Sequence, residues 1–243
     1  MQNGQFEGRV CVVTGGAHGI GKAIAEAFRR EGARVYIIDI TPGPWYVGDV
    51  GSQADLDAFS DMVLGKETSI DFLINNALPI TRGLDQCTYE EFSRALAVGV
   101  TAPFYLTQRF LHHFAPGASV INIASSRDRM SQPQTESYTA AKGGISALTH
   151  ALAVSLAGRV RVNSISPGWI DTTGSRIEGA DALQQPVGRV GKPEDIAELA
   201  VFLCSDKAGF ITGENICADG GMTRLMIYHG EHGWTYTGGE AET

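Results

Sequence analysis

The sequence contains few cysteines, no long apolar run and no cluster of basic residues, and each absence excludes a class of protein. Its four cysteines lie far apart without CxxC spacing, which argues against a disulfide framework and against a cysteine-rich metal site. The most apolar helical run, residues 143–158, is too short and too polar to span a bilayer. A His-x-x-His pair near the C-terminus has no further ligand close by in the sequence, so we expect no metal site.

Positive charge is also scarce. Acidic residues outnumber Lys and Arg by 27 to 19, which gives a formal net charge of −8, and the basic residues are scattered. This distribution argues against binding to nucleic acid and to anionic membranes. A small-molecule substrate is therefore the expected partner.

The chain also lacks segments that would divide it or direct it elsewhere. No linker rich in proline, serine or charge interrupts it, so we expect one domain over residues 1–243. The first ten residues have neither the positive nor the apolar segment of a signal peptide, which favours a cytoplasmic protein. Residues 225–243 form a C-terminal extension whose first part is too apolar to stay in solvent. We expect it to pack near an active-site mouth, with that of a neighbouring subunit as one option.

Short runs rich in β-branched residues alternate with helical segments and predict about seven strands. The runs span residues 9–15, 33–39, 45–50, 71–77, 119–125, 159–168 and 214–220. Most are apolar at nearly every position, which is typical of strands covered on both faces. The pattern predicts an α/β fold, a doubly wound parallel sheet of Rossmann type with helices on both faces. Residues 40–45 leave no room for the usual crossover helix, and one long helix is expected from Tyr89 to about Phe114, loosened at Gly99 and Pro103.

A glycine-rich turn lies between the first predicted strand and an amphipathic helix. Gly15, Gly19 and Gly21 let the backbone turn tightly and approach a pyrophosphate, whose charge the free amides and the helix dipole would stabilise. Asp39 ends the second strand, where a carboxylate accepts hydrogen bonds from the adenosine ribose and repels a 2′-phosphate. No Lys or Arg occupies positions 36–41. NAD is therefore the expected cofactor, while a partly charged His18 in the turn leaves NADP open.

A Tyr-x-x-x-Lys pair, Tyr138 and Lys142, lies within a predicted helix. Residues four apart share one helix face, so the ammonium can lie near the phenol. A neighbouring cation stabilises the phenolate, which makes Tyr138 a candidate base for alcohol oxidation and a candidate acid for carbonyl reduction. Ser125 closes the preceding strand, at the edge where α/β sheets place ligands, and its hydroxyl is a candidate to hold the substrate oxygen.

Seven segments in order resemble the short, single-domain branch of the short-chain dehydrogenase/reductase family. They are TGGAHGIG, NNA, INIAS, YTAAK, NSISPGWIDT, VGKPEDIAELAVFLCSD and FITGENICADGG, and the likeness extends over residues 8 to about 224. The resemblance implies that Tyr138 is the acid/base, that Lys142 lowers its pKa and binds the nicotinamide ribose, and that Ser125 orients the substrate. It also implies a homodimer or homotetramer, with the helix near Tyr138 and the long helix before it as the main interface.

The resemblance extends to cofactor binding. It implies that Asn76 and Ala77 line the adenosine ribose, that Asp49 and Val50 lie beside adenine, and that residues 173–186 form a substrate lid. With the residues of the glycine turn, the expected cofactor-binding set is Gly15, His18, Gly19, Ile20, Gly21, Asp39, Asp49, Val50, Asn76, Ala77, Tyr138, Lys142, Pro167, Gly168, Ile170 and Thr172.

Two positions depart from the family pattern. Relatives carry an asparagine where this chain has Gly99, and in the family that side chain helps to hold a water beside the lysine as a proton exit. Either a water or another group fills the gap, or the relay is broken and the protein binds cofactor without much turnover. We favour a working enzyme because Ser125, Tyr138 and Lys142 are all present. Leu78 stands where relatives have glycine and should crowd the ribose or nicotinamide side.

We therefore expect an oxidoreductase that transfers a hydride between NAD(H) and a secondary alcohol or ketone. The alternative is a catalytically silent module that binds NAD(H) as a sensor or scaffold. An epimerase or dehydratase of the family's extended branch is disfavoured, because such enzymes normally need a larger C-terminal segment. Substrate identity does not follow from these motifs.

Four arginines border the expected substrate mouth. Arg82, Arg127, Arg129 and Arg176 are candidates to bind a carboxylate, sulfonate or phosphate. The alternative is that they are solvated surface charges, with Arg127 or Arg129 paired to Asp128.

Overall fold

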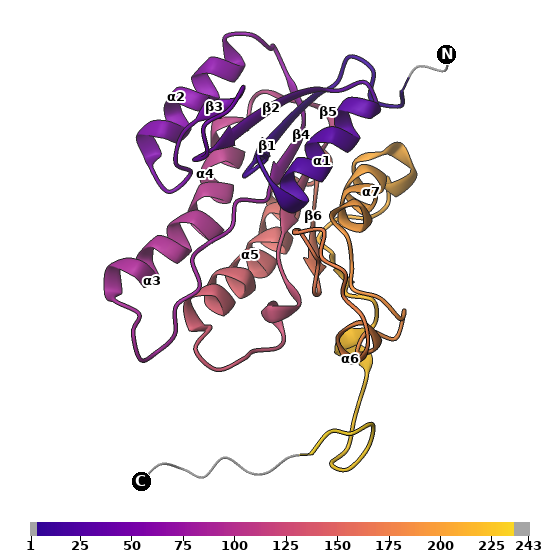
Figure 1. Cartoon of the computed structure of the whole chain (residues 1–243). Coiled ribbons are helices and arrows are strands. Elements are labelled where there is room, and N and C mark those ends of the chain that lie inside the picture. The colour runs from indigo at the N-terminus through magenta and orange to yellow at the C-terminus, as the bar shows by residue number, and fades with distance from the viewer. Residues whose placement is uncertain (1–3, 236–243) are drawn as a thin grey trace.

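The structure, a computed structural model, describes residues 4–235 and contains one parallel sheet (Figure 1). Its strand order is β3-β2-β1-β4-β5-β6-β7, and every pair of neighbours runs parallel. The strands are β1 Val10–Thr14, β2 Arg34–Asp39, β3 Tyr46–Val47, β4 Ile70–Asn75, β5 Phe114–Ile123, β6 Val160–Pro167 and β7 Asn215–Ala218. The predicted doubly wound α/β fold is confirmed.

Helices cover both faces of this sheet. Helices α1 and α7 lie together on one face, and α2, α4 and α5 lie on the other (Figure 1). The helices are α1 Gly19–Arg30, α2 Gln53–Leu64, α3 Tyr89–Leu96, α4 Ala102–Arg109, α5 Glu136–Ser155, α6 Ala180–Leu183 and α7 Pro193–Cys204. None of the helices in the described part of the chain is long and apolar enough to cross a membrane.

The core explains why the strands read as continuous apolar runs. Cys11 and Val13 of β1 pack in the cluster that contains α1 and α7, whereas Val10 and Val12 pack in the cluster on the opposite face. Successive side chains of a strand point to opposite faces, so a strand covered on both sides must be apolar at every position. The sheet therefore forms a rigid base, and its strand ends are fixed points for a site.

The strand order reverses at β1, which pairs with β2 on one side and with β4 on the other. The crossover between β2 and β3, residues 40–45, contains no helix, as the sequence predicts. In open α/β sheets such a reversal leaves a crevice outside the carboxyl ends of the strands, because the two connections depart in opposite directions.

The helical run from Tyr89 is interrupted, as expected, around Gly99. Helix α3 continues into a π-helical turn, Ala97–Thr101, and then into α4. A π turn widens the helix by one residue, which accommodates Pro103 at the start of α4, where a proline cannot donate a backbone hydrogen bond. The expected end near Phe114 is wrong, because α4 ends at Arg109 and Phe114 begins β5, where it pairs with Ile70 of β4.

The start of the C-terminal extension leaves the body of the molecule (Figure 1). Its apolar side chains are largely in solvent, with exposed fractions of 72% for Met226 and 62% for Tyr228. Residues 225–235 thus do not bury their apolar surface against their own subunit. The rest of the extension, 236–243, lies outside the described residues.

Candidate active site

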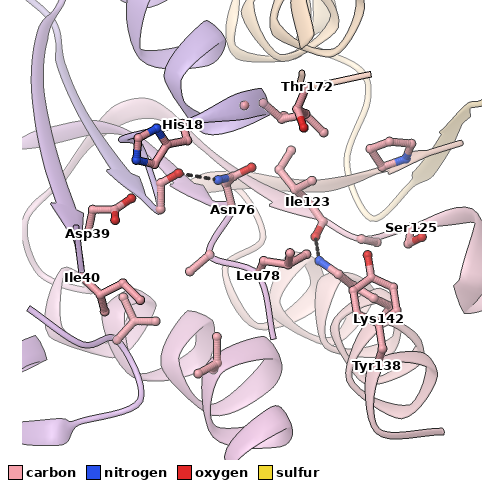
Figure 2. A pocket seen from close by; sticks show the side chains of 18 of the residues that line it. His18, Asp39, Ile40, Asn76, Leu78, Ile123, Ser125, Tyr138, Lys142 and Thr172 are labelled. Atoms are coloured by element: carbon pink, nitrogen blue, oxygen red, sulfur yellow. Dashed lines mark hydrogen bonds between the residues drawn. The ribbon is translucent and has the colours of Figure 1, made fainter. Parts of the chain in front are cut away.

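A cleft of about 540 Å³ lies at the carboxyl ends of the central strands (Figure 2). Its lining comes from the loops that follow β1, β2, β3, β4, β5 and β6, and from α1, α3 and α5. The predicted site residues that line it are Gly15, His18, Gly19, Ile20, Asp39, Asp49, Val50, Asn76, Ala77, Ser125, Tyr138, Lys142, Pro167, Gly168, Ile170 and Thr172. The tertiary fold therefore gathers these separated segments into one cavity.

The glycine turn has the backbone geometry that its residues require. Gly15 and Gly19 have φ of +65° and +53°, a region that side chains other than glycine rarely adopt. A Cβ on Gly15 would lie 2.9 Å from the Cα of Ala77, so the two loops approach closely. Asn76 holds this approach, since its Nδ2 donates to the Gly15 carbonyl at 2.8 Å.

Gly21 is the one predicted cofactor residue that the structure places outside the cleft lining. It is buried in the first turn of α1, and a Cβ there would lie 2.1 Å from the Gly15 carbonyl oxygen. Its role is to let α1 pack against the turn. Gly21 therefore shapes the site from behind, and its contact with the cofactor stays a prediction.

The N-terminus of α1 faces the cleft without a side-chain cap of its own. His18 is its N-cap residue and makes no capping hydrogen bond through its side chain, and the first turn contains no acidic residue. The positive end of the helix dipole and the free amides are thus available to an anion. This arrangement fits the pyrophosphate of a nicotinamide dinucleotide.

Asp39 is held in one orientation at the end of β2. Its Oδ2 accepts from the backbone N–H of Ala17 at 3.0 Å, and its Oδ1 accepts from that of Thr41 at 2.9 Å. Each carboxylate oxygen has a second lone pair left for a ligand hydroxyl. Ile40, which is 70% exposed, lies beside it in the cleft and offers an apolar surface to a base. Together, the Asp39 carboxylate and the Ile40 side chain fit the ribose and the base of an adenosine moiety.

Sequence reasoning missed part of the lining. Arg94 of α3 donates to Asp49 at 2.5 Å, and Val98, four residues later, lies on the same side of the helical run. A four-residue spacing is a signal for a shared helix face, but nothing in the sequence indicates which face meets the cleft. The lining residues outside the expected set are Ile38, Ile40, Thr41, Gly48, Leu78, Arg94, Val98, Ile123 and Ala124.

Ser125, Tyr138 and Lys142 meet at one end of the cleft (Figure 2). Ser125 follows β5, and the other two project from the first turns of α5. The Nζ atom of Lys142 lies 5.6 Å from the centre of the Tyr138 ring and donates to the Ile123 carbonyl at 2.6 Å. Lys142 is only 3% exposed, and it lines the cleft from α5.

Burial perturbs both titratable groups. It raises the pKa of the Tyr138 phenol above its ordinary value, and a hydrogen bond with Ser125 and the charge of Arg127 act against this rise. Burial also lowers the pKa of Lys142 from 10.5 to about 8. Groups with perturbed pKa values in a cleft are typical of catalytic sites.

The two departures from the family pattern have clear positions. A Cβ on Gly99 would lie 2.7 Å from the Cβ of Ala141 on α5, so the helical run and α5 are too close for a larger side chain. Leu78 is 71% exposed and lies in the cleft, between Asn76 and Lys142 (Figure 2). It is placed where it would contact a ligand, in line with the expected crowding.

Comparison with known proteins gives consistent results. The family model described as enoyl-(acyl carrier protein) reductase matches residues 15–223. An uncharacterised oxidoreductase of Thermotoga maritima is 40% identical, over 92% of this chain and 99% of that protein. The 3-oxoacyl-[acyl-carrier-protein] reductase of the same organism is 35% identical, over 90% and 99%.

Comparison with solved structures leads to the same group of proteins. A SCOR enzyme from Clostridium thermocellum, solved in the apo form, has a TM-score of 0.89 and 42% identity, covering 94% of this chain and 98% of its own. A 3-ketoacyl-(acyl-carrier-protein) reductase from Brucella melitensis holds NADH, with a TM-score of 0.81, 31% identity and coverages of 90% and 99%. The angucycline ketoreductase LanV holds NADP, with a TM-score of 0.83, 28% identity and coverages of 92% and 99%. The chain therefore belongs to the short-chain dehydrogenase/reductase family of oxidoreductases.

Proposed function

We propose that this protein is an NAD-dependent dehydrogenase that transfers a hydride between NAD(H) and a secondary alcohol or ketone. The observation that carries the proposal is the meeting of Ser125, Tyr138 and Lys142 at one end of a cleft whose other parts fit a dinucleotide. The nicotinamide, when bound, would accept or supply the hydride. The protein then has to orient the substrate and move one proton.

Each of the three side chains has a role that follows from its position. Tyr138 is the acid/base, because its hydroxyl is the titratable group at the cleft end and hydrogen-bonds to Ser125. Ser125, which is buried at the end of β5, orients the substrate oxygen. Lys142 is held by the Ile123 carbonyl and keeps its remaining N–H groups toward the cleft, where ribose hydroxyls of the cofactor would bind.

The orientation of Asp39 supports NAD over NADP. Two backbone N–H groups fix its carboxylate at the cleft wall, and a 2′-phosphate on the ribose would meet that negative charge. Arg94 lies in the same cleft but is paired with Asp49. A reversal of cofactor preference would therefore require a change at Asp39 itself.

Gly99 and Leu78 are the observations that favour the second candidate, a silent NAD(H)-binding sensor or scaffold. Gly99 has no side chain to hold a water beside Lys142, and Leu78 lies in the path of the cofactor. The intact group of Ser125, Tyr138 and Lys142 supports the enzyme instead, because burial perturbs the pKa values of both Tyr138 and Lys142 beside Ser125, an arrangement that a scaffold does not need.

Reduction of NAD⁺ and NADP⁺, followed by absorbance over a panel of secondary alcohols, polyols and hydroxy acids, tests the proposal. We expect turnover with NAD⁺, a loss of about 10² to 10⁴ in Tyr138→Phe with NADH binding retained, and a preference for NAD⁺ that Asp39→Ser weakens. No turnover of any panel member together with NADH binding would favour the silent module.

We also propose that the subunits assemble as a homodimer or homotetramer through α5 and the α3–α4 run. Apolar side chains stand exposed on these helices, with exposed fractions of 77% for Val154 and 44% for Phe104. Exposed apolar patches of this kind are typical of surfaces that bind another protein. The exposed side chains of residues 225–235 would pack on a neighbouring subunit in the same assembly.

A further inference from the structure

The four arginines near the substrate mouth are not equivalent. Arg82 pairs with Glu91 at 3.4 Å, Arg129 pairs with Asp128 at 3.7 Å, and Arg176 pairs with Glu178 at 2.5 Å. Arg127 has no carboxylate within ion-pairing distance among residues 4–235. Three of the four charges are therefore neutralised within the subunit, and one is not.

Asp128, the neighbour of Arg127 in sequence, is committed elsewhere. Its side chain is 3% exposed, and Oδ2 accepts from Ser146 at 2.9 Å, from Ser166 at 3.2 Å and from Asn215. These partners lie on α5, β6 and β7, so Asp128 points into the body of the molecule. Asp128 therefore does not neutralise Arg127, whose guanidinium lies beside the Tyr138 ring instead.

The backbone ties Arg127 to the reacting groups. Its N–H donates to the Ser125 Oγ at 3.2 Å, and its guanidinium carbon lies 5.7 Å from the centre of the Tyr138 ring. Within residues 4–235, its side chain donates to one neutral acceptor, Gln132 Oε1. Four of the five guanidinium N–H groups are left for a ligand.

An unpaired guanidinium that is half-buried against an aromatic ring selects for an anion, since part of its hydration has already been lost. The planar fork of an arginine matches a carboxylate, with two parallel hydrogen bonds. A phosphate dianion would need more positive charge than one arginine supplies. The second cation nearby, Lys142, is buried and holds the Ile123 carbonyl.

We propose that Arg127 binds a carboxylate group of the substrate while the carbinol or carbonyl carbon lies at Tyr138. This inference rests on the proposed dehydrogenase function and names its substrate class, a short hydroxy acid or the corresponding keto acid. The carboxylate and the reacting carbon are separated by only a few bonds, because the Arg127 guanidinium carbon lies 5.7 Å from the centre of the Tyr138 ring. Arg127 is the specificity-determining residue of the site.

The first test compares each hydroxy acid with its neutral methyl ester in NAD⁺ reduction. Lactate, 3-hydroxybutyrate and cis-4-hydroxycyclohexanecarboxylate provide three matched pairs of increasing length. We expect the wild type to prefer at least one acid over its ester by about 10- to 100-fold in kcat/KM, the range of a charge-assisted hydrogen bond. If alcohols are turned over but no acid is preferred over its ester, the inference about Arg127 is wrong, while the proposed dehydrogenase function is still supported.

Variants assign the preference to this residue. Arg127→Gln should remove the acid preference by raising KM for the acid, and Arg127→Lys should restore part of it, because a point charge replaces the fork. Arg82→Gln is the matched control, since Arg82 is already paired with Glu91, and should keep the preference. An unchanged preference in Arg127→Gln would refute the assignment.

A binding measurement separates this inference from the proposed function. Titration calorimetry of the NADH complex with butyrate, an unreactive carboxylate, needs no turnover. We expect binding that is weakened about tenfold or more in Arg127→Gln and not in Arg82→Gln. Butyrate binding without any alcohol turnover would support the carboxylate site and would count against the proposed dehydrogenase function. Equal binding to the wild type and to Arg127→Gln would refute the site.

Discussion

At the residue scale, burial acts on Tyr138 and Lys142 in opposite directions. It raises the pKa of the phenol and lowers that of the ammonium, because weakly polar surroundings disfavour whichever form carries the charge. The protonated form of Tyr138 therefore predominates near neutral pH and suits the reduction of a ketone. Alcohol oxidation needs the phenolate, and alkaline pH should favour it.

Lys142 should make the stability of the cofactor-free protein depend on pH. Its pKa is about 8 in the folded chain against 10.5 ordinarily, so between these values the unfolded chain binds the additional proton. The free energy of unfolding should rise with pH over this window, by roughly 3 kcal/mol at most. Urea denaturation at several pH values should show this rise in the wild type and its loss in Lys142→Met.

The comparison between the wild type and Lys142→Met depends on how steeply the free energy of unfolding changes with pH, and not on its absolute value. Lys142→Met leaves the Ile123 carbonyl without its partner, which costs about 1 to 3 kcal/mol at every pH. The same pH dependence in the variant as in the wild type would mean that Lys142 does not titrate in this window.

The sequence predicts the positions of Tyr138 and Lys142 better than it predicts the charges around them. The four-residue spacing predicts that Lys142 lies near Tyr138, and the amine does lie 5.6 Å from the ring. The pattern does not reveal that Arg127 is a second cation at 5.7 Å, because that contact joins a loop to a helix across the fold. Sequence analysis put Arg127 at the expected substrate mouth but did not predict its contact with the Tyr138 ring.

At the scale of elements, the α3–α4 run and α5 pack at unusually close range around Gly99. The helical run opens into a π turn there, and the Ala141 methyl group occupies the space that a side chain at position 99 would need. The packing of the two helices therefore leaves no room for an asparagine side chain at position 99. Sequence reasoning found the departure but had no information about the distance between the two helices.

Gly99→Ala should destabilise the protein by about 1 to 3 kcal/mol, because the new methyl group would lie 2.7 Å from Ala141 Cβ. Ala141→Gly removes the obstacle, so the double variant should recover most of the loss, apart from roughly 1 kcal/mol for a helical glycine. A double-mutant cycle from urea denaturation measures this coupling.

Gly143→Ala provides the matched control on α5. A Cβ at this position meets nothing within 4 Å, so the substitution should be neutral or stabilising. Additive effects of Gly99→Ala and Ala141→Gly would show that the two positions do not compete for space.

At the scale of the whole molecule, the parallel sheet creates the cleft and leaves the extension outside it. The loops after six of the strands, β1 to β6, meet at one edge of the sheet, on either side of the order reversal at β1. Residues 225–235 leave that body with Met226 and Tyr228 mostly in solvent. A segment this apolar gains stability only from a surface that its own subunit does not offer, which is the basis for proposing a neighbouring subunit.

Truncation before His229 tests this proposal. Because residues 229–235 belong to neither buried core cluster, the free energy of unfolding of the subunit should change by less than about 0.5 kcal/mol. Sedimentation velocity should show weaker association, or kinetics should show a raised KM for the substrate. A truncated protein with unchanged assembly and unchanged KM would contradict the packing of the extension on a neighbour.

The sequence by itself determined the fold class and the order of the functional segments, because both follow from local rules. Alternation of short apolar runs with helical segments dictates the parallel sheet, and a glycine turn before a helix dictates an anion site. Asp39, Ser125 and Tyr138 could be named for the same reason, since each is fixed by its place at a strand end or on a helix.

Only the tertiary structure decided how these segments meet. It put Gly21 behind the turn, closed the space beside Gly99, and paired Arg129 with Asp128 while giving Arg127 no carboxylate partner among residues 4–235. Each of these outcomes depends on distances of a few ångströms, and the contact between Gly99 and Ala141 joins segments 42 residues apart. Such distances are set by packing of the whole core, which no local pattern encodes.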